Sequence, residues 1–147
     1  MMALALAACG PSLAACGRAE AVPPPAIQPP PGWQPLADVA TAASEAAKAD
    51  GATVDSAAAW GETAMGCYVV TLAVHGAGSP EAIGKELAVA GVHDVAAGSD
   101  SVALAFDKAG YHGKLRAHVG DSIDVVACYW NDREPEACAN ACAGMLK

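Results

Sequence analysis

Four cysteines constrain the fold of this chain more than any other feature: Cys67, Cys128, Cys138 and Cys142. Cys138 and Cys142 are four residues apart, so on a helix they share one face, and a disulfide between them would strain that helix. Each is therefore expected to reach a different strand. The favoured pairing is Cys128–Cys138 with Cys67–Cys142, and the swapped pairing is the next alternative.

The composition makes such cross-links important for stability. Hydrophobic residues make up 54% of the chain, but alanine is the most frequent of them and aromatic residues reach only 5%. Alanine buries little surface, so a domain of roughly 110 residues with this core is expected to be marginally stable from packing alone. One short and one long disulfide loop would contribute roughly 3 and roughly 4.5 kcal/mol by the chain-entropy estimate.

Other cysteine chemistry fits these residues poorly. Structural zinc sites and thiol oxidoreductases use Cys-x-x-Cys, and c-type haem attachment adds a histidine to it, but neither pattern occurs in the chain. The four histidines also lack the paired spacing of metal ligands on a helix. The Gly-rich turn at residues 75–80 resembles a dinucleotide-binding turn, but Glu81 replaces the third glycine. We therefore expect disulfides and no cofactor.

The N-terminus carries the sequence LAACG twice, at residues 6–10 and 13–17. Each copy resembles the lipobox of bacterial lipoproteins, whose cysteine receives a diacylglyceryl thioether and becomes the mature N-terminus. The resemblance implies a signal and lipobox segment over residues 1–16, lipidation of Cys9 or Cys16, and a lipid-anchored, extracytoplasmic location in the bacterial cell envelope. The apolar run itself is too short to span a bilayer, and an ordinary cleaved signal or an Ala-rich tail is the alternative.

A Pro-rich segment follows the lipobox copies. Residues 21–33, AVPPPAIQPPPGW, contain six prolines, which favour a stiff polyproline II conformation. We expect residues 17–35 to form a disordered spacer, with an SH3-type ligand as the alternative, and residues 36–147 to form one folded domain.

Periodicity predicts the elements of that domain. Helices are expected at residues 35–50, from Ser79-Pro80-Glu81 onward and at 135–146, and strands at 65–75, 101–107, 112–119 and 122–130. Short connections between the last three strands indicate an antiparallel meander. The predicted fold class is α+β: a single two-layer domain with a mainly antiparallel four-stranded sheet and helices packed on one face.

Charge and motifs limit the function. The net charge is −8 and the basic residues form no patch, which argues against nucleic-acid binding. Asp132, Glu134 and Glu136 precede or begin the last helix, where carboxylates match the helix dipole. The segment of Trp130, Asn131, Asp132, Arg133 and Glu134 is the candidate partner contact.

The sequence therefore predicts a lipid-anchored, non-catalytic binding module. Its expected partners are the membrane, through the N-terminal lipid, and an envelope protein or a glycan. Two alternatives stay open. One is a small extracytoplasmic hydrolase that uses Asp132, Glu134 and Glu136 with a nearby histidine, and the other is a metal-binding protein.

Overall fold

The computed structural model describes residues 23–76 and 91–147, in which the chain forms two helices and seven strands. The helices are α1 (Ala37–Ala49) and α3 (Pro135–Met145). The strands are β1 (Gln34–Pro35), β2 (Thr53–Glu62), β3 (Cys67–His75), β4 (Val92–Ala97), β5 (Ser101–Lys108), β6 (Tyr111–Val119) and β7 (Ile123–Trp130). The helix expected to begin at Ser79-Pro80-Glu81 lies outside the described residues.

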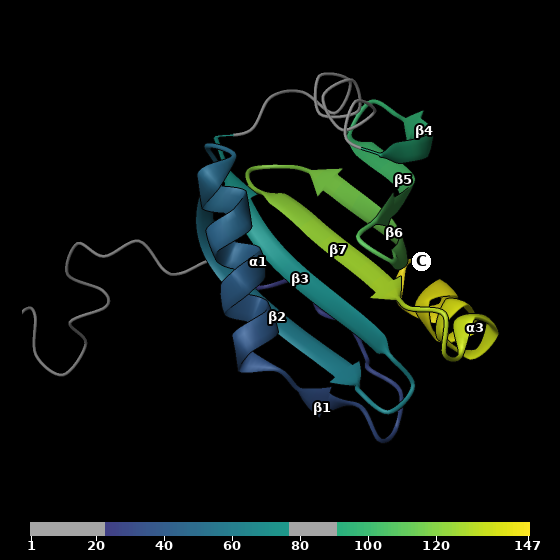
Figure 1. Cartoon of the computed structure of the whole chain (residues 1–147). Coiled ribbons are helices and arrows are strands. Elements are labelled where there is room, and N and C mark those ends of the chain that lie inside the picture. Colours follow the sequence, from purple (N-terminus) through teal and green to yellow (C-terminus); the bar gives the residue numbers. More distant parts are fainter. Residues whose placement is uncertain (1–22, 77–90) are drawn as a thin grey trace, which may run out of the picture.

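The seven strands form one antiparallel sheet in the order β1-β2-β3-β7-β6-β5-β4. Strands β4 to β7 form a meander, β2 and β3 form a hairpin, and the pairing of β3 with β7 joins the two parts (Figure 1). The prediction of a four-stranded sheet is wrong, although its four strands and its α+β class are found.

The additional strands lack the alternation of apolar and polar residues that marks a half-buried strand. Strand β2 contains three consecutive alanines at residues 57–59, and alanine favours helix over strand. Its pairing with β3 extends from Thr53 opposite His75 to Glu62 opposite Cys67, so tertiary hydrogen bonding overrides local preference. Strand β4 is short, and a register shift between His93 and Ala96 interrupts its pattern.

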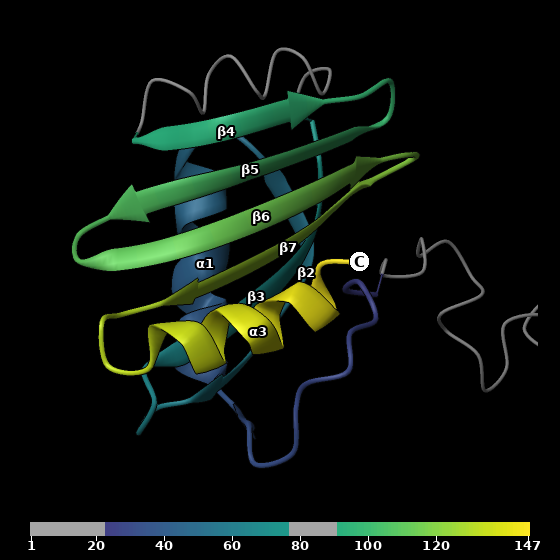
Figure 2. The same ribbon diagram turned by 90° about the vertical axis from the view of Figure 1, so that its right-hand side faces the viewer.

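The two helices lie on opposite faces of the sheet, so the prediction of helices on one face is also wrong. Helix α1 crosses β2 and β3 on one side, and α3 lies against β7 on the other (Figure 2). The reason is visible in β3, where the consecutive residues Val69 and Val70 point to opposite faces and are 0% and 5% exposed. A central strand that is apolar on both faces requires cover on both faces.

The apolar stripe predicted for α1 is confirmed. The half-buried positions include Leu36, just before the helix, and Val39, Ala40, Ala43 and Ala47 within it. Leu36 approaches so closely that Gly61 of β2 has no space for a Cβ atom. Small residues on both elements thus allow the helix to lie directly on the strand.

Each face has its own hydrophobic core. The α3 side buries Val69, Val126, Trp130 and Met145 together with the four cysteines. The α1 side buries a second cluster toward the β4–β7 part of the sheet, made of Val74, Val102, Leu104, Ala117 and Ile123. Most of these side chains are small, as the composition implied, so neither core is large.

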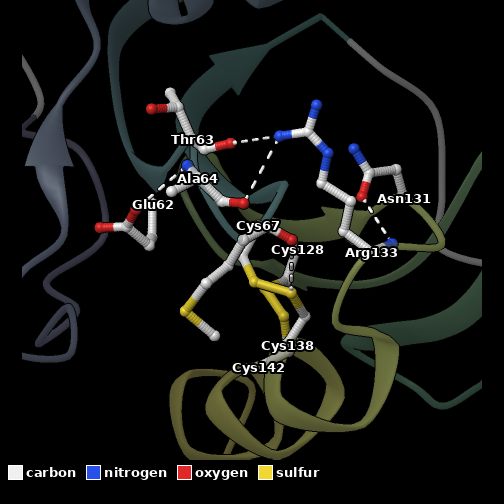
Figure 3. Close-up of a disulfide and its surroundings, with 10 residues drawn as sticks. Glu62, Thr63, Ala64, Cys67, Cys128, Asn131, Arg133, Cys138 and Cys142 are labelled. Carbon is white, nitrogen blue, oxygen red and sulfur yellow. Dashed lines mark hydrogen bonds between the residues drawn. A yellow bond between two sulfur atoms is a disulfide. The ribbon is translucent and has the colours of Figure 1, made fainter.

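The two disulfides close α3 onto the sheet (Figure 3). They pair Cys67 with Cys138 and Cys128 with Cys142, at Cα–Cα distances of 5.5 and 5.8 Å. This is the swapped pairing, so the favoured pairing of Cys128–Cys138 with Cys67–Cys142 is wrong. In the part of the chain that the structure describes, no cysteine is free.

The direction of α3 explains the pairing. Cys67 lies opposite Trp130 at the end of β7, and Cys128 lies two residues further back along that strand. The helix folds back over the strand, so Cys138, in the first half of α3, lies over Cys67. Four helical residues advance about 6 Å and two strand residues about 6.6 Å, which places Cys142 over Cys128.

Residues 23–33, the described part of the Pro-rich segment before β1, have no helix or strand. Two of their side chains nevertheless contact the domain, because Ile27 and Trp33 pack against the core on the α3 side. Strand β1 then pairs Gln34 with Gly61 and Pro35 with Trp60 at the edge of β2.

Candidate functional site

Helix α3 covers only part of its face of the sheet. It lies against β7, and none of the described elements covers the same face of β4, β5 and β6 (Figure 2). We call this exposed surface the open face. Its side chains come from alternate positions of the strands: His93 of β4, Ala103, Ala105 and Asp107 of β5, and His112, Lys114, Arg116 and His118 of β6.

A shallow hollow of about 330 Å³ occupies the centre of the open face. Its floor is formed by Ala103 and Ala105, which lie directly opposite Arg116 and Lys114 on the neighbouring strand. Leu146, just after α3, contributes a wall. The hollow exists because two alanines stand where larger side chains would fill the space between the strands.

A chain of hydrogen bonds between imidazoles and carboxylates borders this hollow. The His–Asp chain comprises Asp94, His93, Asp107, His112 and Asp132, in that order. His93 lies 2.9 Å from Asp94 through Nδ1 and 2.7 Å from Asp107 through Nε2. His112 contacts the other oxygen of Asp107 through Nδ1 and lies 2.9 Å from Asp132 through Nε2.

These contacts favour the protonated imidazoles. A histidine donates from both ring nitrogens only as the cation, and both nitrogens of His93 and His112 face carboxylate oxygens. Hydrogen bonds to Asp94 and then Asp107 raise the pKa of His93, and hydrogen bonds to Asp107 and then Asp132 raise the pKa of His112. Hydrogen bonds from His112 and His93 lower the pKa of Asp107.

The His–Asp chain can take up and release protons at the surface of the open face. Its two histidines are about half exposed to solvent. Within the described residues, no serine, threonine or cysteine side chain is hydrogen-bonded to either imidazole. The nitrogens contact carboxylates pairwise, and no group of three ligands in the described part of the chain converges on one point that could hold a metal ion.

Three of the predicted partner-contact residues have internal roles. Trp130 is buried in the core on the α3 side, with 7% of its surface exposed. Asn131 packs on Gly66, whose carbonyl accepts a hydrogen bond from the Asn131 backbone N–H at 3.1 Å. The Arg133 guanidinium donates to the carbonyls of Thr63 and Ala64 at 3.5 and 3.4 Å, so this loop is docked on the β2–β3 turn (Figure 3).

The three candidate carboxylates, Asp132, Glu134 and Glu136, do not lie together in one site. All three are exposed, but only Asp132 is hydrogen-bonded to His112, and neither Glu134 nor Glu136 is hydrogen-bonded to a histidine in the described residues. Glu136 lies in the first turn of α3, as the dipole argument expected. The proposed trio therefore does not form one site.

Sequence reasoning did not assign a site to the residues of the open face. The usable signal was the alternation of His112, Lys114, Arg116 and His118, which places four basic side chains on one face of β6. The partners of His112 and the alanine floor could not be found in this way, because they depend on the register of β5 against β6 and on the docking of the loop after β7.

No known family, curated protein or solved structure matches the chain. The structure alone therefore carries the functional argument. The two disulfides indicate an oxidising, extracytoplasmic environment. Among the described residues, no helix is both long and apolar enough to cross a bilayer.

Proposed function

We propose that the chain is a lipid-anchored, non-catalytic binding module of the bacterial cell envelope, and that it contacts its ligand through the open face. The observation that carries the proposal is the contrast across the α3 side of the sheet. One part is closed by a helix held by two disulfides, and the other part is a solvent-facing surface with a shallow hollow. A rigid scaffold beside an accessible hollow suits binding.

The anchoring part of the proposal is tested by replacing Cys9 and Cys16 separately with alanine. The variant that removes the acylated cysteine should move from the membrane fraction to the soluble extracytoplasmic fraction, and the other should stay with the membrane. Mass spectrometry of the N-terminal peptide identifies the acyl group. Unchanged membrane association of both variants and of the double variant would count against lipidation.

The binding part is tested by site-specific photo-crosslinking in intact cells. A photoreactive residue in place of Ala103, on the floor of the hollow, should give a defined adduct with an envelope protein or a glycan. The matched control replaces Glu45, which is exposed on α1 on the opposite side of the sheet. The same adducts from both positions, or none from Ala103, would contradict a binding role for the open face.

A hydrolase is the second candidate, because His112 lies between Asp107 and Asp132. A general base needs an oriented and neutral histidine: Asp107 and Asp132 supply the orientation, and His112 is neutral only above its raised pKa. If the chain hydrolyses an ester or amide substrate, His112→Gln should abolish turnover, whereas His118→Gln on the same strand should not. Equal turnover by the wild type and His112→Gln would remove this candidate.

A further inference from the structure

We infer that the hollow of the open face binds a carboxylate group, presented by the end of a short peptide with small apolar side chains. The inference rests on the proposed function, because it names the ligand class of the same surface. It follows from the placement of positive charge, from one contact that Arg116 already makes, and from the size and lining of the hollow.

Positive charge is concentrated at this hollow in a strongly acidic chain. Lys114 and Arg116 line it side by side on β6, roughly 7 Å apart along the strand. In the part of the chain that the structure describes, neither pairs with an Asp or Glu side chain, whereas Lys48 pairs with Glu45 at 3.1 Å; Arg116 is hydrogen-bonded through Nη1 to the backbone oxygen of Lys147. Lys114 and the remaining guanidinium donors of Arg116 are therefore available to an anionic ligand.

The acidic side chain at the rim does not cancel this charge. Asp94 lines the hollow from the bulge of β4, but it accepts a hydrogen bond from His93 at 2.9 Å. The same imidazole also contacts Asp107 and has a raised pKa, so the charge of a protonated His93 is shared between Asp94 and Asp107. Among the side chains that line the hollow, one carboxylate therefore stands against the two cations Lys114 and Arg116.

Arg116 already binds a main-chain oxygen. Its Nη1 donates to the backbone oxygen of Lys147, which follows the wall residue Leu146. A guanidinium has five N–H donors in a planar fork, and this contact uses one nitrogen. The remaining donors can bind both oxygens of a carboxylate, which is the geometry that arginine favours.

The size and lining limit the rest of the ligand. The volume of about 330 Å³ lies at the lower end of small-ligand sites, which span roughly 300–1,000 Å³. Ala103, Ala105 and Leu146 present methyl groups and no hydrogen-bonding side chain. Short aliphatic side chains match that surface, whereas a long or multiply charged ligand would meet Asp94.

The test is a residue-resolved NMR titration of the folded, oxidised protein with N-acetyl-alanyl-alanine. Saturable shifts are expected at the amides of Ala103, Ala105, Lys114 and Arg116. The C-terminal amide of the same dipeptide should bind at least about tenfold more weakly, because it lacks the charge-assisted hydrogen bonds. Arg116→Gln should weaken binding by a similar factor, and so should Ala103→Leu, which fills the exposed hollow without removing a charge.

Lys108→Gln is the matched control, since Lys108 is exposed on β5 and does not line the hollow. It should leave the affinity unchanged. Equal binding of acid and amide, equal binding of inorganic phosphate, or saturable shifts elsewhere would overturn the inference. If the dipeptide does not bind but photo-crosslinks from Ala103 persist, the ligand class is wrong and the proposed function stands. If the dipeptide does not bind and Ala103 gives no photo-crosslinks, both the inference and the proposed function are overturned.

Discussion

Thr71 buries a hydroxyl group in the middle of the sheet. The residue is 0% exposed, and its Oγ1 has no hydrogen-bond partner among the described residues. Its neighbours across the strands are Ala58 and Val126, which offer only methyl groups. A buried hydroxyl without a partner costs roughly 1–3 kcal/mol, so this residue lowers the stability of a core that is already small.

Thr71→Val should therefore stabilise the domain. Valine keeps the shape and replaces the hydroxyl with a methyl group, so the free energy of unfolding should rise by about 1 kcal/mol or more. Urea denaturation of the oxidised protein measures the change. Thr71→Ala is the control, because the cavity it leaves offsets the gain. A Val variant less stable than the wild type would show that Oγ1 is satisfied in solution.

The His–Asp chain should make stability depend on pH. The pKa of His112 is raised above its usual 6.5, so its contribution is complete below that value and is lost as the pH rises through the folded pKa. The pKa of Asp107 is lowered below its usual 3.8, so its contribution is lost only as the pH falls through that lower value. The His–Asp chain therefore stabilises the fold most at pH values between the lowered pKa of Asp107 and the raised pKa of His112.

His112→Gln tests this directly. Its loss of stability relative to the wild type should be larger at about pH 5.5 than at about pH 8.5, as measured by urea denaturation. His118→Gln is the matched control, since His118 lies on the same face of β6 and makes no side-chain hydrogen bond within the described residues. An equal loss at both pH values would contradict a protonated His112.

At the scale of elements, α3 is held to the sheet by covalent bonds more than by its own packing surface. Its buried residues are Cys138, Cys142 and Met145, and two of the three are half-cystines. The disulfides span sequence separations of 71 and 14 residues. By the chain-entropy estimate these loops contribute about 4.5 and about 3 kcal/mol.

Removing the long loop should cost more than removing the short one. All four half-cystines are 0% exposed, so the packing losses of the two pairs are similar and the loop length decides. The double variant Cys67→Ser with Cys138→Ser should be less stable than Cys128→Ser with Cys142→Ser by about 1.5 kcal/mol. Urea denaturation compares them.

A thiol count checks the pairing itself. The variant Cys128→Ser with Cys142→Ser should show no free thiol at Cys67 or Cys138, because these two stay bonded to each other. Cys128→Ser with Cys138→Ser removes one partner from each disulfide and should leave free thiols at Cys67 and Cys142, as located by peptide mapping after thiol alkylation. Free thiols in the first variant and none at Cys67 and Cys142 in the second would instead indicate the pairing of Cys128–Cys138 with Cys67–Cys142.

Sequence patterns predicted the elements that carry a clear period. Helix α1, the Pro-started α3, and the strands β3, β5, β6 and β7 were found where apolar residues recur at helical or alternating spacing. Strand β2 could not be predicted, because its alanines acquire strand structure only through pairing with β3. The disulfide pairing could not be predicted either, because it depends on the direction in which α3 folds back over β7.

At the scale of the whole molecule, the segment before β1 is part of the packed domain from Ile27 onward. Ile27 and Trp33 contact the core that also contains the disulfides. In the proposed anchored protein, 11 residues would separate Ile27 from a lipid on Cys16, and 18 residues from a lipid on Cys9. At the rise of polyproline II these lengths reach at most roughly 34 and 56 Å, which would limit the height of the open face above the membrane.

Trp33→Ala should destabilise the domain although Trp33 lies in the predicted spacer. Its indole is partly buried against the core on the α3 side, so the free energy of unfolding should fall by about 1–2 kcal/mol. Gln28→Ala is the matched control, because Gln28 is exposed in the same segment. An equal stability of both variants would show that the tether extends to β1.

The two outer strands of the sheet have a consequence for self-association. An exposed strand edge can template the edge of another chain, and proteins suppress this with bulges, charges and proline. Strand β4 has a register shift at Asp94, whose φ of 53° turns the backbone out of the regular strand. At the opposite edge, β1 is two residues long and contains Pro35, which has no N–H to donate. Both ends of the seven-stranded sheet are thus poor templates, which disfavours edge-to-edge aggregation of the protein.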